Sequence, residues 1–516
     1  MIQTTRRKFV TAIGAGLGLG LAGCKATLIP APRSADYPFK LGVASGEPDT
    51  SGFVIWTKLA PEPLKGDGGM ADQVVPVNWA VATDRRMSNT VRSGQVLATP
   101  DWGHSVHVEV SGLRPGKTYW YRFESGGETS PVGRTITFPE DPSRLRFAVA
   151  SCQNYEVGYF GAYEHMLGDN LDFILFLGDY IYETVNRKGH LRLHKGVESE
   201  TLEQYRQRYT QYRLETDLQN AHAAMPWLVT LDDHEVDNDF AGLNNYGDVD
   251  KVEFAQRRAA AFKAFYEFMP LRSAQRPVGS DMQLYRSFEF GSLASMSMTD
   301  MRQFRDNQAC REPGKKPGRA VGADCTERLD EDRSMLGAVQ EQWLDTRMAN
   351  SSAHWTIIAQ QQHINPWVQT GDAGEPNWWT DDWNGYPAAR ERLLNSLASS
   401  GAKNPVFLAG DIHSFWATAL PGDRSNRAST PIATEFVTSG ITSAGPPHDY
   451  FMSLMPKNPQ VRYFDSRLAG YIVCDVNRKR WRTDYYAVDP DVPNNPERAL
   501  VASYVVEPGN PDPRPA

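Results

Sequence analysis

Phe173-Ile174-Leu175-Phe176-Leu177, followed by Gly178-Asp179-Tyr180-Ile181-Tyr182-Glu183, is the stretch that decides the fold of this chain. A run of strand-forming apolar residues bounded by a glycine is typical of a buried strand. The polar residues that follow then lie where the strand ends, at the rim where layered sheets keep their ligands. The sequence therefore predicts a buried strand with Asp179 at its end.

The same pattern, a strand-like run followed directly by acid, thiol, imidazole or polar side chains, occurs at five more places. These are Phe147–Ala150 before Ser151-Cys152-Gln153, Trp227–Leu231 before Asp232-Asp233-His234-Glu235, Trp355–Ala359 before Gln360-Gln361-Gln362-His363, Val406–Ala409 before Gly410-Asp411-Ile412-His413, and Glu435–Thr438 before Ser439. Carboxylates, a thiol, a tyrosine and histidines gathered on one rim predict a metal centre.

The composition is that of an ordinary globular protein. The chain has 516 residues, of which 41% are hydrophobic and 22% charged, so it is long enough for two to four domains or for one large core with an appendage. Its formal net charge is −8, and a chain without a basic field is not expected to bind nucleic acid specifically.

The N-terminus is expected to be an export signal. Thr5-Arg6-Arg7-Lys8-Phe9-Val10 precedes an apolar, glycine-rich run over residues 12–22 and resembles a twin-arginine signal. Leu21-Ala22-Gly23-Cys24 resembles a lipobox, which predicts lipidation of Cys24; a Sec-type signal or a short membrane anchor is the alternative. We expect export by the twin-arginine translocase to the periplasm or cell surface, with membrane contact only through the signal or a lipid anchor. No later segment has the pattern of a membrane span.

Four of the five cysteines lie outside the signal. Cys310 and Cys325 flank a Gly/Pro/Lys-rich loop and are expected to form a disulfide in an oxidising compartment. Cys474 lies in a predicted buried strand, where cysteine is most often a small core residue. Cys152 remains unpaired in this count, at a strand end beside polar neighbours.

The pattern of elements divides the chain into four segments. Residues 1–37 form the signal, lipobox and tether, and residues 38–140 form a β-sandwich whose strands include 53–56, 77–80, 106–110 and 119–123. From 145 to 490, buried strands alternate with helices, including 201–212, 252–268 and 335–347, which is typical of a large α/β domain. Residues 491–516 are a C-terminal extension with a proline-rich tail from about Glu507. The Trp-rich stretch Asn377–Trp383 is a loop, either a substrate wall or a surface loop with anchoring aromatics.

The order of the motifs resembles a known layout. Dinuclear phosphoesterases use a Gly-Asp pair for a carboxylate that bridges two metals, then an Asn-His-type pair, then a Gly-His-x-His-type pair. Here the corresponding places hold Gly178-Asp179, Asp233-His234 and Gly410-Asp411-Ile412-His413. With Ser151-Cys152-Gln153, Thr299–Asp306 and Glu435–Ser443, the chain resembles the PhoD-type alkaline phosphatases from about residue 39 to about residue 484. The resemblance implies a fibronectin III-like β-sandwich followed by a calcineurin-like metallophosphoesterase domain, an αββα sandwich.

The resemblance also implies roles for individual residues, although each motif alone has a plain structural explanation such as core packing, a helix cap or a surface salt bridge. Fe³⁺ would be held by Cys152, Asp179, Tyr182 and His413, since thiolate and phenolate need a strong Lewis acid. Ca²⁺, which prefers oxygen ligands, would be held by the bridging Asp179 with Asp233 and Asp411, and more weakly by Asn238 and Asp232. His234, Arg302 and Arg305 would contact the phosphoryl group. Asp237-Asn238-Asp239 departs from the pair of asparagines that the family usually shows.

The function implied is that of an exported, metal-dependent alkaline phosphatase and phosphodiesterase. It would hydrolyse phosphate mono- and diesters with a metal-activated oxygen nucleophile and so scavenge phosphate. The alternative is a catalytically inactive surface-binding lipoprotein, in which the sandwich recognises a polymer. The sequence leaves the choice between monoester, nucleotide, phospholipid and wall-polymer substrates open.

Overall fold

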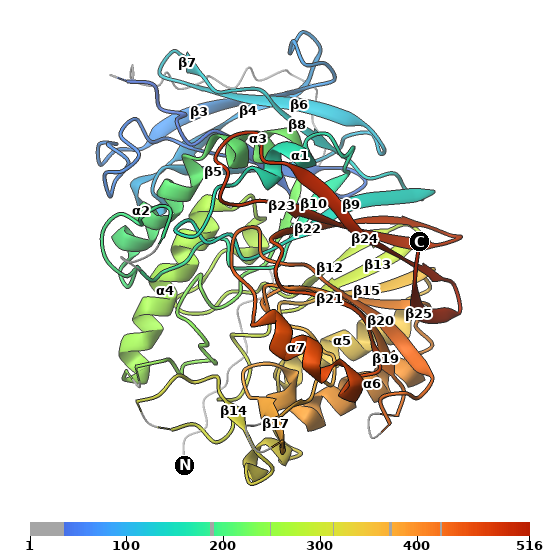
Figure 1. Ribbon diagram of the computed structural model, residues 1–516. Coiled ribbons are helices and arrows are strands. Elements are labelled where there is room, and N and C mark those ends of the chain that lie inside the picture. The colour runs from blue at the N-terminus through green and yellow to red at the C-terminus, as the bar shows by residue number, and fades with distance from the viewer. Residues whose placement is uncertain (1–35, 186–189, 248, 313, 371–373, 424–425) are drawn as a thin grey trace, which may run out of the picture.

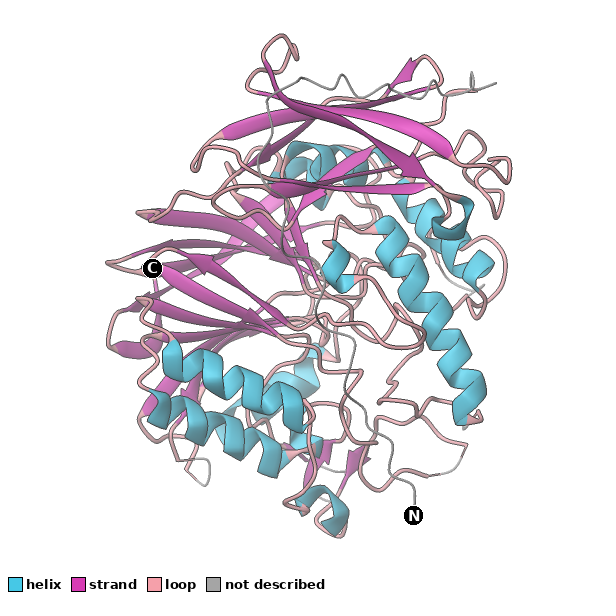
Figure 2. Ribbon diagram, turned by 180° about the vertical axis from the view of Figure 1, so that it is seen from behind, coloured by secondary structure: helices cyan, strands magenta, loops and turns pink. Residues whose placement is uncertain are grey.

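The computed structural model describes residues 36–185, 190–247, 249–312, 314–370, 374–423 and 426–516. Two large β-sheets face each other at the centre, and helices cover the outer face of each (Figure 1 and Figure 2). The predicted signal, with Cys24, lies outside the described residues. Within the described ranges, we find no helix with the length and apolar character needed to cross a membrane.

The larger central sheet has ten strands in the order β25-β24-β23-β22-β9-β10-β11-β1-β2-β5. β9, β10 and β11 pair in parallel, with Phe176 opposite both Ala150 and Val229. β10 and β11 are buried along their whole length, which explains why their sequences are continuous apolar runs. The strands are β1 (Val43–Gly46), β2 (Phe53–Lys58), β5 (Ser105–Val110), β9 (Arg144–Ala150), β10 (Phe173–Phe176), β11 (Trp227–Val229), β22 (Gly470–Asn477), β23 (Trp481–Val488), β24 (Arg498–Glu507) and β25 (Asn510–Pro515).

The second central sheet has seven strands in the order β12-β13-β15-β18-β20-β19-β21. β13, β15, β18 and β20 are parallel, with Ala359 opposite Leu408 and Ala409 opposite Val437. The strands are β12 (Arg286–Phe290), β13 (Ala294–Met298), β15 (Trp355–Ala359), β18 (Pro405–Ala409), β19 (Phe415–Pro421), β20 (Pro431–Val437) and β21 (Val461–Asp465). A separate small sheet is made of β14 (Ala320–Val321), β17 (Pro376–Trp379) and β16 (Gln369–Thr370). All six strands predicted before the polar motifs are confirmed.

Aromatic side chains fill the space between the two central sheets. The rings of Phe147 and Phe173 stack with centroids 4.8 Å apart, and Phe173 stacks in turn on Phe290 of the second sheet at 5.6 Å. The first four helices pack on the outside of the large sheet, and α5 and α6 on the outside of the second. The helices are α1 (Ala162–Met166), α2 (Leu202–Arg213), α3 (Thr216–Ala224), α4 (Lys251–Phe268), α5 (Ala338–Asn350), α6 (Pro387–Ser400) and α7 (His448–Leu454).

The predicted helices are confirmed, but α5 is shifted by three residues at both ends, to Ala338–Asn350 from the expected 335–347. α2 and α4 lie where the apolar periodicity places them. α5 begins at Ala338 rather than at Met335, because Gly337 has a φ of 73° and so cannot continue a helix from the preceding residues.

The N-terminal part of the chain forms a sandwich that shares a sheet with the rest of the molecule. A five-stranded sheet packs its apolar face on β1, β2 and β5 and lies at the top of Figure 1. β1 pairs with β11 through Gly46 and Trp227, so segments 38–140 and 145–490 meet within one continuous sheet. The strands of this five-stranded sheet are β3 (Val75–Ala82), β4 (Thr90–Ala98), β6 (Thr118–Ser125), β7 (Glu128–Thr129) and β8 (Gly133–Ile136).

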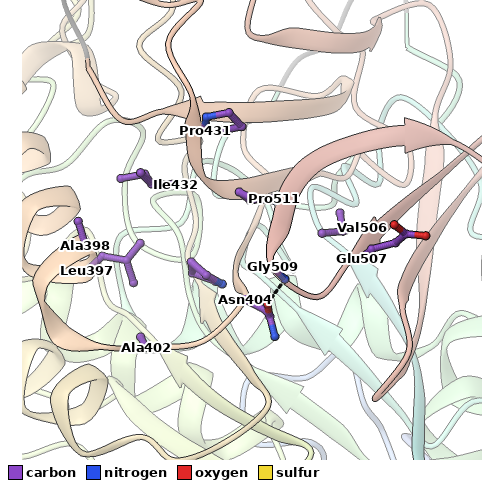
Figure 3. Close-up of a pocket in the computed structure, with 11 residues that line it drawn as sticks. Leu397, Ala398, Ala402, Asn404, Pro431, Ile432, Val506, Glu507, Gly509 and Pro511 are labelled. Atoms are coloured by element: carbon purple, nitrogen blue, oxygen red, sulfur yellow. Dashed lines mark hydrogen bonds between the residues drawn. The ribbon is translucent and has the colours of Figure 1, made fainter.

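The C-terminal segment adds two strands to the large sheet, of which β25 is the edge strand. β24 pairs with β23, and β25 pairs with β24, so the proline-rich tail is a strand rather than an unstructured end. Proline has no backbone N–H to donate. It is tolerated in β25 because one side of an edge strand forms no hydrogen bonds to a neighbouring strand. The hairpin closes a pocket of about 300 Å³ at the start of β18 and β20, where Asn404 Oδ1 accepts the Gly509 N–H at 2.7 Å (Figure 3). This pocket lies at the rim opposite the strand-end motifs.

Candidate metal centre

The strand ends of both central sheets meet at one rim. The N–H of Cys152 donates to the carbonyl of Gly178 at 3.1 Å, which joins the loops after β9 and β10. The N–H of Ile441, from the loop after β20, donates to the carbonyl of Ser151 at 2.9 Å. Polar residues that follow strands of two different sheets are therefore brought to the same place.

Four of the predicted ligands have left-handed backbone conformations. Their φ angles are 57° at Cys152, 58° at Asp179, 64° at Asp411 and 53° at His413. Aspartate and histidine adopt this region more often than other residues, whereas for cysteine it is uncommon. Each such residue costs about 1–3 kcal/mol, and such residues gather at functional sites. The fold thus holds these side chains in place against local strain.

The four residues predicted to hold iron lie together. Cys152, Asp179 and His413 each place a possible ligand atom within 4.8 Å of the other two. The Tyr182 hydroxyl donates to Asp179 Oδ2 at 2.9 Å and lies 3.2 Å from His413 Nε2. His413 Nδ1 lies 3.0 Å from the carbonyl of Ala444, which fixes the ring with Nε2 toward the cluster.

The donor set of this cluster fits a cation. Burial, reinforced by the charge of Asp179, raises the pKa of the Cys152 thiol and of the Tyr182 phenol well above their ordinary values. Burial likewise raises the pKa of Asp179, and it lowers the pKa of His413 to about 4. Neighbouring anions cannot all ionise in a buried space, whereas a bound cation stabilises thiolate, phenolate and carboxylate together and needs a neutral imidazole.

A second group of carboxylates adjoins the first. Asp233 belongs to a cluster with Asp179 and His234 and to another with Asp232 and Asp411, each with possible ligand atoms within 4.8 Å of one another. Asp232 Oδ2 is buried and has no hydrogen-bond partner within the part of the chain that the structure describes. An orphaned carboxylate oxygen among other carboxylates is the environment that an oxygen-seeking cation such as Ca²⁺ fits.

Arg302 is the cation that the chain itself supplies to these carboxylates. Its side chain is completely buried. It donates through Nε to Asp232, through Nη1 to Asp381 Oδ2 at 2.8 Å, and through Nη2 to Asp411 Oδ1 at 3.2 Å. Asp233 Oδ2 lies 3.6 Å from Nη2. The guanidinium group is thus surrounded by carboxylates, so the structure brings Arg302 to the site as their partner.

Arg305 lies behind the site. Its side chain is also completely buried, and its guanidinium donates to Asp381 Oδ1 at 2.5 Å. It also donates to three backbone carbonyls, those of Asp381 at 2.8 Å, Asp239 at 3.1 Å and Phe240 at 2.9 Å. These contacts hold loops together. The Nη1 and Nη2 donors of Arg305 are thus taken up by a carboxylate and carbonyls, whereas its buried Nε has no hydrogen-bond partner among the residues that the structure describes.

His234 lies at the open side of the site. Its Nδ1 is 2.7 Å from Glu183 Oε2, its ring stacks on Tyr182 with centroids 4.1 Å apart, and its side chain is 15% exposed. Asp411 is more open still, at 29% side-chain exposure. Asn238 donates its backbone N–H to Glu183 Oε1 at 3.0 Å, which places it in the loop beside His234.

Two further residues of the site were not singled out from the sequence. Glu235 follows His234 directly but is buried beneath the loops, where it accepts backbone N–H groups. Asp381 lies in the Trp-rich stretch, and it is buried against Arg302 and Arg305. Glu235 was visible as part of the Asp-Asp-His-Glu motif. No sequence signal links Asp381 to the distant arginines.

The remaining cysteines are accounted for. Cys310 and Cys325 are joined by a disulfide with their Cα atoms 5.9 Å apart. Cys152 and Cys474 are free and buried. Cys474 lies in the middle of β22 within the core between the sheets, which leaves Cys152 as the free thiol at the rim.

Known proteins resemble this chain over almost its whole length. Residues 147–485 match the family model of the PhoD-like phosphatase, and residues 23–139 match that of the PhoD-like phosphatase N-terminal domain. Alkaline phosphatase D of Bacillus subtilis (strain 168) is 44% identical over 497 residues, which cover 93% of this chain and 84% of that relative. A solved structure of PhoD is 42% identical and superposes with a TM-score of 0.89 over 94% of this chain and 93% of its own. The chain therefore belongs to the PhoD-like phosphatase family.

Proposed function

We propose that this protein is a metal-dependent alkaline phosphatase and phosphodiesterase, acting on phosphate mono- and diesters. The observation that carries the proposal is the convergence of Cys152, Asp179, Tyr182 and His413 from separate strand ends. Family membership supports the phosphatase activity, and the name of the Bacillus subtilis relative supports the same chemistry. As part of the proposal, the facing sheets form a calcineurin-like domain over 145–490, preceded by a fibronectin III-like sandwich.

Two metal sites follow from the donor atoms. Cys152, Asp179, Tyr182 and His413 would hold Fe³⁺, since thiolate and phenolate are donors for a strong Lewis acid. On the other side of Asp179, Asp233 and Asp411 would hold Ca²⁺, with Asp232 and Asn238 as additional oxygen donors. When bound, the two ions would supply Lewis acidity at the phosphoryl oxygens and would favour ionisation of the attacking oxygen.

The protein's own residues divide the remaining work. His234, whose Nδ1 lies 2.7 Å from Glu183 Oε2, would use its other ring nitrogen to bind the phosphoryl group and to give a proton to the leaving oxygen. Arg302 would position Asp232, Asp233 and Asp411 rather than bind phosphate directly, because its donors already face these carboxylates. The partly exposed Asp411 marks where an ester would enter.

The test is an activity panel run together with elemental analysis of the purified protein. We expect hydrolysis of p-nitrophenyl phosphate and of its bis-ester, loss of both activities on chelation, and stoichiometric iron. Cys152→Ala should lose iron and activity together. Cys474→Ala is the matched control, because it removes the other free, buried thiol from the core without touching the rim.

The outcomes separate the two hypotheses. Full activity in a metal-free sample would reject the mechanism. Protein that contains no iron and hydrolyses neither ester would instead support an inactive surface-binding lipoprotein.

We also propose that the chain is exported by the twin-arginine route and anchored through Cys24. The support is the Arg6-Arg7 pair and the lipobox-like Leu21–Cys24 stretch. Arg6→Lys with Arg7→Lys should retain the protein in the cytoplasm, and Cys24→Ala should abolish labelling by a radioactive fatty acid. Unchanged export or unchanged labelling would reject the respective part.

A further inference from the structure

A loop closed by the Cys310–Cys325 disulfide lies beside the carboxylates of the site. Its apolar cluster is small and separate from the main cores, with Ala309, Val321 and the two cysteines as members. Segments with few buried apolar contacts are those that open most easily. The covalent link therefore closes a loop that has few buried apolar contacts of its own.

The loop is attached to the segment that leads into Asp381. β14 pairs antiparallel with β17, with Ala320 opposite Trp379, and both lie in the lower part of Figure 1. The N–H of Thr380 donates to the carbonyl of Arg319 at 2.9 Å, and the N–H of Arg319 donates to Thr380 Oγ1 at 3.1 Å. Since Asp381 is the next residue, these contacts hold the backbone from which its carboxylate extends.

The same loop also holds Asp239. The N–H of Gly318 donates to Asp239 Oδ2 at 3.1 Å. Gln308, two residues before Cys310, donates its Nε2 to the Asp239 carbonyl at 2.7 Å and to Asp381 Oδ1 at 2.6 Å. Gln308, just before the loop, and Gly318, in its middle, thus both contact Asp239, and Gln308 also contacts Asp381.

These aspartates are coupled to the metal centre. Carboxylate oxygens of Asp233, Asp239 and Asp381 lie within 4.8 Å of one another. Asp381 also accepts from Arg302, the arginine that pairs with Asp411. A displacement of Asp381 would leave this buried guanidinium without one of its partners and would shift the carboxylates that it holds.

We propose that the Cys310–Cys325 disulfide is a positioning element of the site, which makes the activity sensitive to thiol reductants. This inference rests on the proposed phosphatase function. A dithiol would break the Cys310–Cys325 bond by forming its own disulfide; two electrons pass to the protein sulfurs, and two protons complete the two thiols. The loop then opens, Asp239 and Asp381 lose their fixed positions, and the site is complete only in an oxidising compartment.

The test compares wild type with the Cys310→Ser/Cys325→Ser double variant. We expect the variant to lose about ten-fold or more in kcat/KM, mostly in kcat, as for a small misplacement of catalytic groups. Its 314–325 and 376–382 peptides should exchange amide hydrogens faster, while exchange in β10 and β18 stays unchanged. Dithiothreitol should bring the wild type to the same level, reversibly, and should leave the variant unaffected.

Cys474→Ala is the control, because it keeps the disulfide and should remain fully active and sensitive to reduction. Full activity and unchanged exchange in the double variant would overturn the positioning role. Exchange faster throughout the molecule would overturn it too, since the disulfide would then stabilise the whole fold. If oxidised wild type hydrolyses no phosphate ester, the proposed function fails, and the exchange data still decide whether the disulfide holds the two segments.

Discussion

Glu235 accepts the backbone N–H of Asp179 at 3.0 Å, although the two residues are 56 positions apart in the chain. The same carboxylate oxygen accepts the N–H of Asp232 at 2.8 Å, and its other oxygen accepts the N–H of Tyr180. One completely buried side chain therefore joins the loop after β10 to the loop after β11. This contact holds together the two loops that carry Asp179 and Asp233, which we propose to hold metal.

Replacing Glu235 by glutamine should weaken both the fold and the site. An amide offers one acceptor oxygen instead of two and turns an NH₂ group toward a backbone N–H, so at least one buried donor is left unsatisfied. We expect a loss of about 1–3 kcal/mol in the free energy of unfolding, measured by urea denaturation, and at least about ten-fold lower kcat. Glu164→Gln, on the exposed side of α1, should change neither; equal behaviour of the two variants would contradict the role of Glu235.

Gly178→Ala should disrupt the site by a direct clash. An added Cβ would lie 2.4 Å from the backbone nitrogen of Asp232, and the φ of Gly178 is 109°. Gly401→Ala is the matched control, because Gly401 has a φ of 77° with no atom within 4 Å of its Cβ position, so it reports backbone strain alone. We expect Gly401→Ala to cost about 1 kcal/mol and Gly178→Ala about 1–3 kcal/mol more. Chemical unfolding measures both, and similar costs would argue against close packing of the two loops.

Acid should weaken the contact between the N-terminal sandwich and α4 through His107. Its Nε2 lies 2.9 Å from the carbonyl of Tyr266 and 3.0 Å from that of Met269, and burial lowers the pKa of His107 to about 4. The unfolded chain, with an ordinary pKa near 6.5, binds this proton first. The stabilisation is therefore complete above about pH 6.5 and is lost as the pH falls toward 4, by at most about 3 kcal/mol.

The measurement is urea unfolding of the wild type and His107→Gln between pH 4.5 and 7.5. The variant keeps a side-chain donor but has no titrating group there, so the wild type should lose more stability on acidification. A constant difference between the two proteins over this range would refute the contribution of His107.

Removal of metal should lower the thermal stability of the protein. An ion that binds the folded chain but not the unfolded chain raises the free energy of unfolding by about 2.7 kcal/mol at a concentration 100 times its Kd. We expect chelation to lower Tm, and added Ca²⁺ to restore part of it in the wild type. Asp411→Asn should respond less, because it removes one carboxylate charge from the proposed calcium side. Calorimetry with KCl at equal ionic strength is the control, and an equal response to KCl would show that the effect is only screening.

The chemistry of the rim could be predicted from local sequence. A continuous apolar run such as Phe173–Phe176 can be satisfied only in a strand buried on both faces, and the polar residue after it then lies at the strand end. Because parallel neighbours run in register, the residues that follow β9, β10 and β11 had to meet. The family resemblance carried by these motifs is confirmed by the comparisons.

Other features depend on contacts between segments that are distant in sequence. The family resemblance implies that Arg302 and Arg305 contact the phosphoryl group, and only the fold shows that Asp381 lies within hydrogen-bond distance of both. The pairing of Gly46 with Trp227, which makes the sandwich part of the large sheet, has no local signal either. Strands and the polar residues at their ends can thus be predicted from residues that are neighbours in the sequence. Which charged groups become buried, and which strands join one sheet, depends on which surfaces meet when the chain packs. Local sequence is thus enough to predict which groups lie at the rim, whereas the packing of distant segments sets which of them face one another.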